Sequence, residues 1–249
     1  LGNVPDSAFS NKTNLNTVIL GNLIAGVDNN AFSGCTGLTD ITLPDSVTTI
    51  GNYAFSGCGL TSIVIPEFVT TIGEYAFGTI PNLSNITIKS YISNIPQVFL
   101  GSNSVNMSVT LDYLGSVPQY AFSDKINLST VILGNLITDV QRYAFSGCTS
   151  LTGITFPESV TTISQYAFSR CSSLTSILIP ESVTTIGYYA FSDIPNLSNI
   201  TIKSYIADLH HAFPNSNPVN MSVTLDYLGN VPDSAFSNKT NLNTVILGS

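Results

Sequence analysis

Residues 174–196 read LTSILIPESVTTIGYYAFSDIPN, and this 23-residue stretch contains the features that decide the fold. It opens with Leu174, Ile177 and Ile179 in the pattern L-x-x-I-x-I. Alternating apolar positions rich in Ile and Thr predict a short strand with one buried face. Pro180 then ends the strand, because proline cannot donate a hydrogen bond to a continuing ladder.

A second apolar set follows in the same stretch, at Val183, Ile186, Ala190 and Phe191. It has no sustained helical period, so it predicts a short strand or turn followed by a helical turn, not a long helix. A unit of this size cannot close a core alone. Copies must therefore stack side by side and bury a continuous one.

The unit recurs along the whole chain, with Ala-Phe or a near variant returning every 22 or 23 residues. Stacked coils place identical positions above one another at the strand spacing of about 4.8 Å. The phenylalanines should therefore form an internal column. Its members are Phe9, Phe32, Phe55, Phe77, Phe99, Phe122, Phe145, Phe168, Phe191, Phe213 and Phe236.

The repeat motif I-P-x-S-V-T-x-I-x-x-x-A-F-x-x-C-x-x-L is carried best by residues 41–60, 154–174 and 177–197. This motif resembles the BspA-like leucine-rich repeats of bacterial and protozoan surface proteins. The resemblance implies a repeat solenoid: a leucine-rich-repeat horseshoe or curved right-handed coil. It also implies a parallel β-sheet on the concave face, with short turns or helical turns on the convex face.

A longer period overlies the short one. We expect residues 1–249 to form a single solenoid of about eleven repeats, grouped as blocks 1–113 and 114–227 and the start of a third block, 228–249. The blocks share the opening Leu-Gly-x-Val-Pro, at Leu1, Leu114 and Leu228.

Composition excludes several classes of partner. Charged residues make up only 9% of the chain, and the formal net charge is −8 with seven basic residues. Nucleic acid and anionic membrane surfaces require clustered Lys and Arg, so neither is an expected partner. No apolar run approaches 18 residues, so membrane insertion is not expected either.

The strand positions between the buried residues should form the concave surface, which is rich in hydroxyl groups and nearly free of charge. Either it is an ordinary solvated sheet or it is a broad recognition face. The candidate binding residues are Thr17, Thr42, Asn85, Thr87, Thr110, Thr155, Leu178, Asn199, Thr201 and Thr224.

Tyrosines recur two residues before the column phenylalanines. Since Phe points inward, these tyrosines should point at least partly outward and form a stripe. Tyr gives a large contact area with a polar tip, so the stripe either contacts a sugar or protein, or packs against the next coil. The tyrosines are Tyr53, Tyr75, Tyr120, Tyr143, Tyr166 and Tyr189.

The residues that carry most chemistry do not assemble into a recognisable reaction centre. Four cysteines occupy one repeat position and act either as small buried fillers or as disulfides between adjacent coils. The only histidines, at 210 and 211, are expected in a solvated loop. Carboxylates that follow the strand prolines are either solvated charges, cation ligands or, least favoured, catalytic acids. The cysteines are Cys35, Cys58, Cys148 and Cys171, and the carboxylates are Asp45, Glu67, Glu158 and Glu181.

We therefore expect a non-enzymatic, extracellular or cell-surface protein, without a cofactor or bound metal, that adheres to or binds a protein or glycan on another surface. Two alternatives remain open. The sequence begins and ends in ordinary repeat units, which favours a longer array or a structural protein that assembles head to tail into filaments. A carbohydrate-binding module is the weaker alternative.

Overall fold

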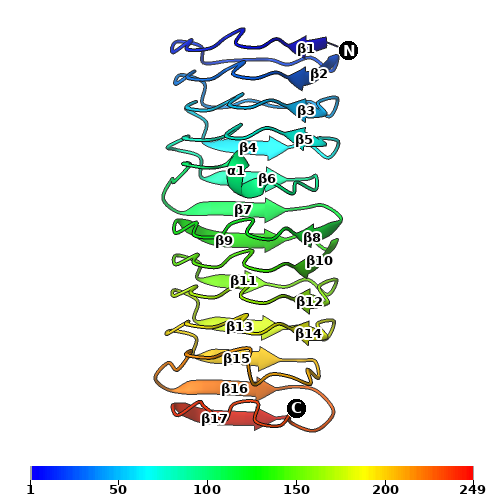
Figure 1. Cartoon of the computed structure of the whole chain (residues 1–249), viewed down its shortest axis with the longest axis vertical. Helices are drawn as coiled ribbons and strands as arrows, with labels where there is room; N and C mark the ends of the chain where they lie inside the picture. The colour runs from blue at the N-terminus through cyan, green and yellow to red at the C-terminus, as the bar shows by residue number, and fades with distance from the viewer. Residues whose placement is uncertain (1, 249) are drawn as a thin grey trace. The chain divides into compact units, whose positions relative to one another are not determined.

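The computed structural model describes residues 2–248. The chain divides into two compact units, Leu1–Tyr113 and Leu114–Ser249, called here the N-terminal and C-terminal units. The second unit begins at the second Leu-Gly-x-Val-Pro start. Each unit is a parallel β-solenoid with almost no helix (Figure 1). The expectation of one uninterrupted solenoid stays a prediction.

The L-x-x-I-x-I segments of the N-terminal unit form a broad parallel sheet. Its strands align residue for residue, with Ser62 opposite Asn85 and Asn85 opposite Ser108. Equivalent positions of consecutive repeats therefore lie side by side. The strands, in spatial order, are β4 (Ser62–Ile65), β6 (Asn85–Ile88) and β7 (Met107–Leu111).

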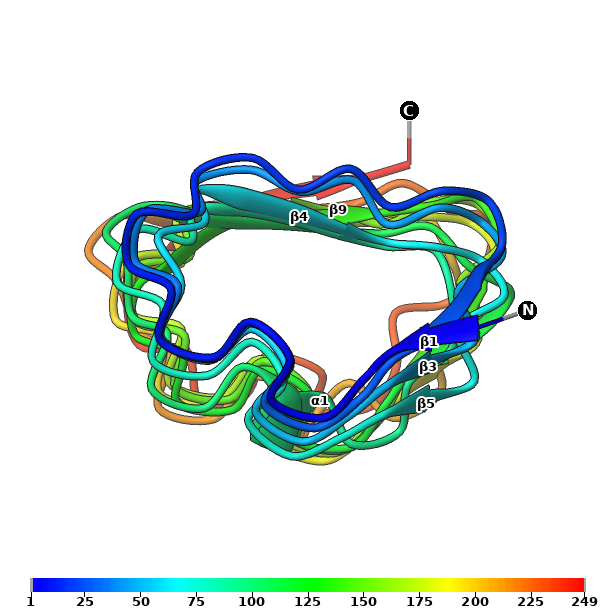
Figure 2. The same cartoon turned by 90° about the horizontal axis from the view of Figure 1, so that it is seen from above.

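A second, smaller sheet of the N-terminal unit is built from the V-T-x-I segments and their counterparts. Figure 2 shows its strands on a different side of the coil from β4, so each coil turns a corner between its two strand segments. The smaller sheet has the order β1 (Gly2–Val4), β2 (Ile24–Val27), β3 (Thr49–Ile50) and β5 (Thr71–Ile72).

The C-terminal unit repeats this plan. Its broad-sheet strands form two groups. In the first, β9 (Leu128–Leu133) pairs with β11 (Gly153–Thr155). The second is a separate sheet with the order β13 (Ser176–Ile179), β15 (Asn199–Ile202), β16 (Met221–Leu225) and β17 (Leu242–Leu247). Its smaller sheet contains β8 (Gly115–Val117), β10 (Ile137–Val140), β12 (Thr162–Ile163) and β14 (Thr185–Ile186).

The segment around most column phenylalanines is a turn with a left-handed residue on either side, and Phe99, Phe213 and Phe236 have such a residue on one side only. Tyr189 and Asp193 flank Phe191 with φ values of 61° and 56°. The backbone N–H groups of these three residues donate to carbonyls of residues 211–214 on the next coil, at 2.7–3.0 Å. The alternating conformation thus continues the ladder through the turn. Most units use a short turn here; the single helix in residues 2–248 is α1 (Ile95–Val98).

The phenylalanines form an internal column within each unit, as the repeat spacing predicted. Consecutive ring centroids from Phe9 to Phe99 lie 5.2–5.7 Å apart, and those from Phe122 to Phe236 lie 5.2–6.1 Å apart. All except the two outermost, Phe9 and Phe236, are fully buried. Burial of each ring contributes about 1.5–3 kcal/mol, so the column is a principal source of stability.

Candidate functional site

Two rows of side chains project outward from the broad sheets, from the strand positions between the buried residues. None of the ten candidate binding residues is buried. The structure brings several together across strands: Thr87 faces Thr110, and Thr201 faces both Leu178 and Thr224. Their role in binding stays a prediction. The first row contains Thr17, Asp40, Ser62, Asn85, Ser108, Thr130, Gly153, Ser176, Asn199, Ser222 and Thr244, and the second contains Ile19, Thr42, Val64, Thr87, Thr110, Ile132, Thr155, Leu178, Thr201, Thr224 and Ile246.

The two rows combine exposed aliphatic groups with neutral polar groups. Ile132 is 52% exposed, Val64 47% and Leu178 45%, although the residues on either side of each in the strand are buried. Ile19 is 90% exposed and lies between two half-buried residues. Asp40 is the one charged residue in either row. The surface can therefore bury apolar area and form hydrogen bonds without desolvating charges, apart from the one at Asp40.

A groove crosses the broad-sheet side of the C-terminal unit, and no sequence motif marks it. It lies over the junction of β11 and β13, which belong to different sheets, and its volume is about 740 Å³. The one sequence feature that could have predicted this groove is Gly153, the only glycine in the two outward rows. The outward-facing or loop residues of its lining are Thr130, Ile132, Asn135, Gly153, Thr155, Pro157, Ser176, Leu178, Asn199 and Thr201.

The tyrosine stripe is present as stacked rings. Tyr120, Tyr143, Tyr166 and Tyr189 stack in sequence, with centroids 4.8–5.1 Å apart and ring planes within 11° of parallel. Tyr53 and Tyr75 form a separate pair, 5.0 Å apart, in the N-terminal unit. All six tyrosines are partly or fully exposed.

Stacking limits what the stripe can bind. The face of an inner ring such as Tyr143 is covered by the neighbouring rings, and Arg142 lies 4.9 Å from its centroid. A ligand that stacks on aromatic faces would therefore find a free face only at the ends of each stack. Between the ends, the stripe offers ring edges and hydroxyl groups. The tyrosine rings thus pack against the next coil and are also exposed to solvent.

The cysteines are buried free thiols. Cys58 donates a hydrogen bond of 3.1 Å to the carbonyl of Phe32, and Cys148 donates one of 3.1 Å to the carbonyl of Phe122. Burial and, to a lesser extent, the nearby Cys35 thiol raise the pKa of the Cys58 thiol to about 12. These thiols are suited to structure, since reactive cysteines require a lowered pKa and access to solvent.

The cysteines lie three residues after a column phenylalanine. In the first repeat of each block, a lysine occupies this position, namely Lys12, Lys125 and Lys239. Lys239 donates to the carbonyls of Phe213 and Ser216, the latter at 3.1 Å. Burial lowers the pKa of the Lys239 amine to about 8. Burial likewise lowers the pKa of Lys125. Lys125 and Lys239 place a donor inside the coil at the position where the cysteine thiols donate.

The repeat geometry agrees with a family model. The BspA type leucine-rich repeat region matches in six copies, over residues 2–113 and 115–243. The chain belongs to the BspA-type leucine-rich-repeat family. None of the curated proteins matches it.

Solved structures similar to this BspA-type chain include a leucine-rich repeat protein from Bacteroides ovatus, with 21% identity, 90% of this chain and 80% of that chain covered, and a TM-score of 0.44. A leucine-rich cell surface protein from Faecalibacterium prausnitzii has 30% identity, with 80% of this chain and 62% of that chain covered, and a TM-score of 0.37. The pneumococcal vaccine antigen PcpA has 17% identity, 95% and 68% coverage, and a TM-score of 0.48.

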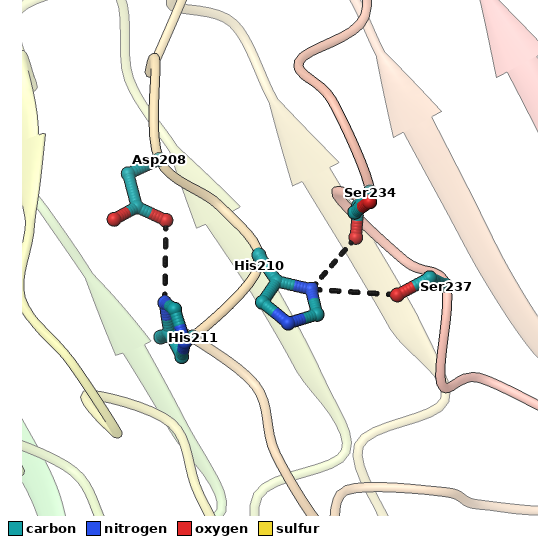
Figure 3. Close-up of polar contacts among 5 residues, drawn as sticks. All are labelled: Asp208, His210, His211, Ser234 and Ser237. Carbon is teal, nitrogen blue, oxygen red and sulfur yellow. Dashed lines mark hydrogen bonds and ion pairs between the residues drawn. The ribbon is translucent and has the colours of Figure 1, made fainter.

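The histidines of this BspA-type chain do not form a nucleophile relay with the residues they contact (Figure 3). Asp208 lies 3.6 Å from Nδ1 of His211. Ser237 contacts a different ring, with its hydroxyl 3.4 Å from Nδ1 of His210, and the Ser234 carbonyl lies 3.0 Å from the same nitrogen. A relay requires one imidazole between the acid and the serine, and here the two contacts are on separate rings.

The four carboxylates that follow the strand prolines are all exposed, as solvated charges are. Residues 2–248 contain no group of three or more His, Cys, Asp or Glu side chains placed to hold a metal ion. None of the helices in this range has the length and apolar character needed to cross a membrane.

Proposed function

We propose that this protein is a non-enzymatic, cell-surface or secreted repeat protein that binds a partner on another surface through the outward rows of its broad sheets. One observation carries the proposal. The rows hold exposed Ile19, Val64, Ile132 and Leu178 among neutral hydroxyl and amide groups, with a single charge at Asp40. Exposed aliphatic groups with polar neighbours are a feature of protein surfaces that bind partners.

Surface display follows from the resemblance to BspA-like surface proteins, and the binding face follows from the two rows. No catalytic step is part of the proposal, because the polar residues of the rows do not form an acid–base pair. Head-to-tail assembly, the other expectation from the repeats, stays a prediction. The tyrosine stripe supports a carbohydrate-binding role less well than the rows do, because its inner ring faces are covered.

Flow cytometry with the fluorescently labelled full chain tests the proposal. The probes are intact epithelial cells and intact bacterial cells. The double variant Thr87→Glu and Thr201→Glu places one charge on the rows of each unit. We expect it to bind cells about ten-fold more weakly, since burial of an unpaired charge is costly.

The matched control is the double variant Thr70→Glu and Thr184→Glu. It adds the same two charges at exposed positions beside the smaller sheets. We expect it to bind like the wild type. Failure of the wild type to bind either cell type, or equal losses in both double variants, would overturn the proposal.

A further inference from the structure

The groove at Gly153 exists because one side chain is missing from the first outward row. A Cβ atom built at Gly153 would meet no atom within 4 Å, and the residue does not have a positive φ. Neither close packing nor the backbone conformation therefore requires glycine at this position. Its effect is to leave open the space between Thr130 and Ser176 above β11.

The N-terminal unit provides a built-in comparison. Of the fourteen lining residues, twelve have an identical counterpart in the N-terminal unit. Leu178 is replaced by Val64, and Gly153 is replaced by Asp40. Asp40 lines two separate hollows of about 600 and 290 Å³, so its side chain stands where the single groove lies in the C-terminal unit. Gly153 and Asp40 thus distinguish two otherwise nearly identical surfaces.

The chemistry of the Gly153 groove is neutral and mixed. The lining contains no charged residue. The hydroxyl groups of Thr155, Ser176 and Thr201 have no hydrogen-bond partner among residues 2–248, so they can bond a ligand. Exposed Ile132 and Leu178 add apolar contact area on either side of Thr155. A volume of about 740 Å³ lies in the range of small-molecule sites.

We infer that the Gly153 groove binds a short neutral saccharide chain. Such a ligand carries hydroxyl groups for the polar lining and C–H surfaces for Ile132 and Leu178, and it leaves no charge unpaired. A peptide with charged side chains would find no partner charge in the lining. In the N-terminal unit, Asp40 occupies the corresponding space and adds a charge. The inference rests on the proposed function and names the ligand class of one part of its binding face.

The test uses the full chain and a panel of neutral oligosaccharides of glucose, galactose, mannose and N-acetylglucosamine, three to six units long. Acidic oligosaccharides and a peptide of similar size with charged side chains complete the panel. Binding and stoichiometry are measured by isothermal titration calorimetry. We expect at least one neutral oligosaccharide to bind at one site per chain, and the acidic oligosaccharides and the peptide not to bind.

Reciprocal variants locate the site. Gly153→Asp should weaken binding about ten-fold or more, because it places a carboxylate in the groove. Asp40→Gly should raise the stoichiometry from one site toward two, because it recreates the groove in the N-terminal unit. Thr184→Asp, at an exposed position beside the smaller sheet, should leave binding unchanged. Unchanged melting curves would show that the variants fold.

Three results would overturn the inference: no binding of any neutral oligosaccharide, equal binding by wild type and Gly153→Asp, or binding of the peptide or acidic sugars instead. The cell-binding assay separates this failure from that of the proposed function. If the chain binds no oligosaccharide and yet binds cells in a manner sensitive to Thr87→Glu and Thr201→Glu, only the saccharide inference fails.

Discussion

The thiol of Cys171 donates a hydrogen bond of 3.2 Å to the backbone carbonyl of Phe145 on the preceding coil. The hydroxyl of Ser216, at the same repeat position, donates one of 2.7 Å to the carbonyl of Phe191. Both donors are buried. Cysteine and serine at this repeat position thus both supply a buried donor to the preceding coil, whereas a buried isoleucine fills the same position at Ile80 and Ile194.

Replacement of Cys171 tests this role. Cys171→Val removes the thiol donor, while the Phe145 carbonyl keeps the backbone N–H of Cys148 at 3.2 Å, so the free energy of unfolding should fall by about 0.5–1.5 kcal/mol. Cys171→Ser keeps a donor and should lower it less. Urea denaturation of both variants measures the difference. A valine variant as stable as the serine variant would contradict the assigned role.

The raised pKa of Cys58 predicts a dependence of stability on pH. The thiol has a pKa of about 12 in the folded chain and an ordinary value of 9.0 when unfolded. The folded state therefore favours the protonated thiol. Its contribution to stability is fully present below about pH 9 and is lost as the pH rises through about 12. Between these values the wild type should lose more unfolding free energy than Cys58→Ser, and parallel pH profiles would show that this thiol is not responsible.

The aromatic column is tested at Phe168, whose ring lies 5.3 Å from Phe145 and 5.4 Å from Phe191. Phe168→Ala should cost about 3–5 kcal/mol of stability, as for other buried aromatic residues. Phe68 is the matched control, because it is 57% exposed and lies outside the column. Phe68→Ala should change stability by less than about 0.5–1 kcal/mol. Equal shifts in thermal melts would mean that the column is not the core.

The sequence was sufficient for the core because the repeat places chemically equivalent side chains on one another. A Phe every 22 or 23 residues and the L-x-x-I-x-I pattern predicted the internal column and the broad sheets. The turn conformations could not be predicted in the same way. Tyr189 carries a φ of 61° without the Gly or Asn that normally marks a left-handed residue, because hydrogen bonds to the next coil hold it there.

The left-handed tyrosines reverse the usual order of Gly and Ala substitutions. Tyr143 has a φ of 57°, so Tyr143→Gly should be more stable than Tyr143→Ala by about 1 kcal/mol. Both variants lose the ring stacking equally. Tyr188 is an exposed tyrosine without positive φ, and there the alanine variant should be the more stable one. Chemical denaturation measures the unfolding free energy of the four variants. If glycine and alanine ranked in the same order at Tyr143 and Tyr188, the backbone conformation would not be responsible.

The candidate binding residues were predictable as outward positions because a strand alternates its faces. The groove was not predicted, because its origin is a missing side chain at Gly153 and not a motif. The sequence contains the signal only as a difference between equivalent positions, Gly153 and Asp40. Its meaning depends on the space around each residue in the folded coil, which the sequence does not contain.

Hydroxyl-radical footprinting of the chain, free and bound to the cells it recognises, tests most directly whether the broad-sheet rows are the binding face. Ile132 and Leu178 are exposed in the free chain and should become protected from oxidation on binding. The exposed Tyr188, beside the stripe, should be oxidised equally in both states. Protection confined to Tyr120, Tyr143, Tyr166 and Tyr189, with unchanged oxidation of Ile132 and Leu178, would contradict the account.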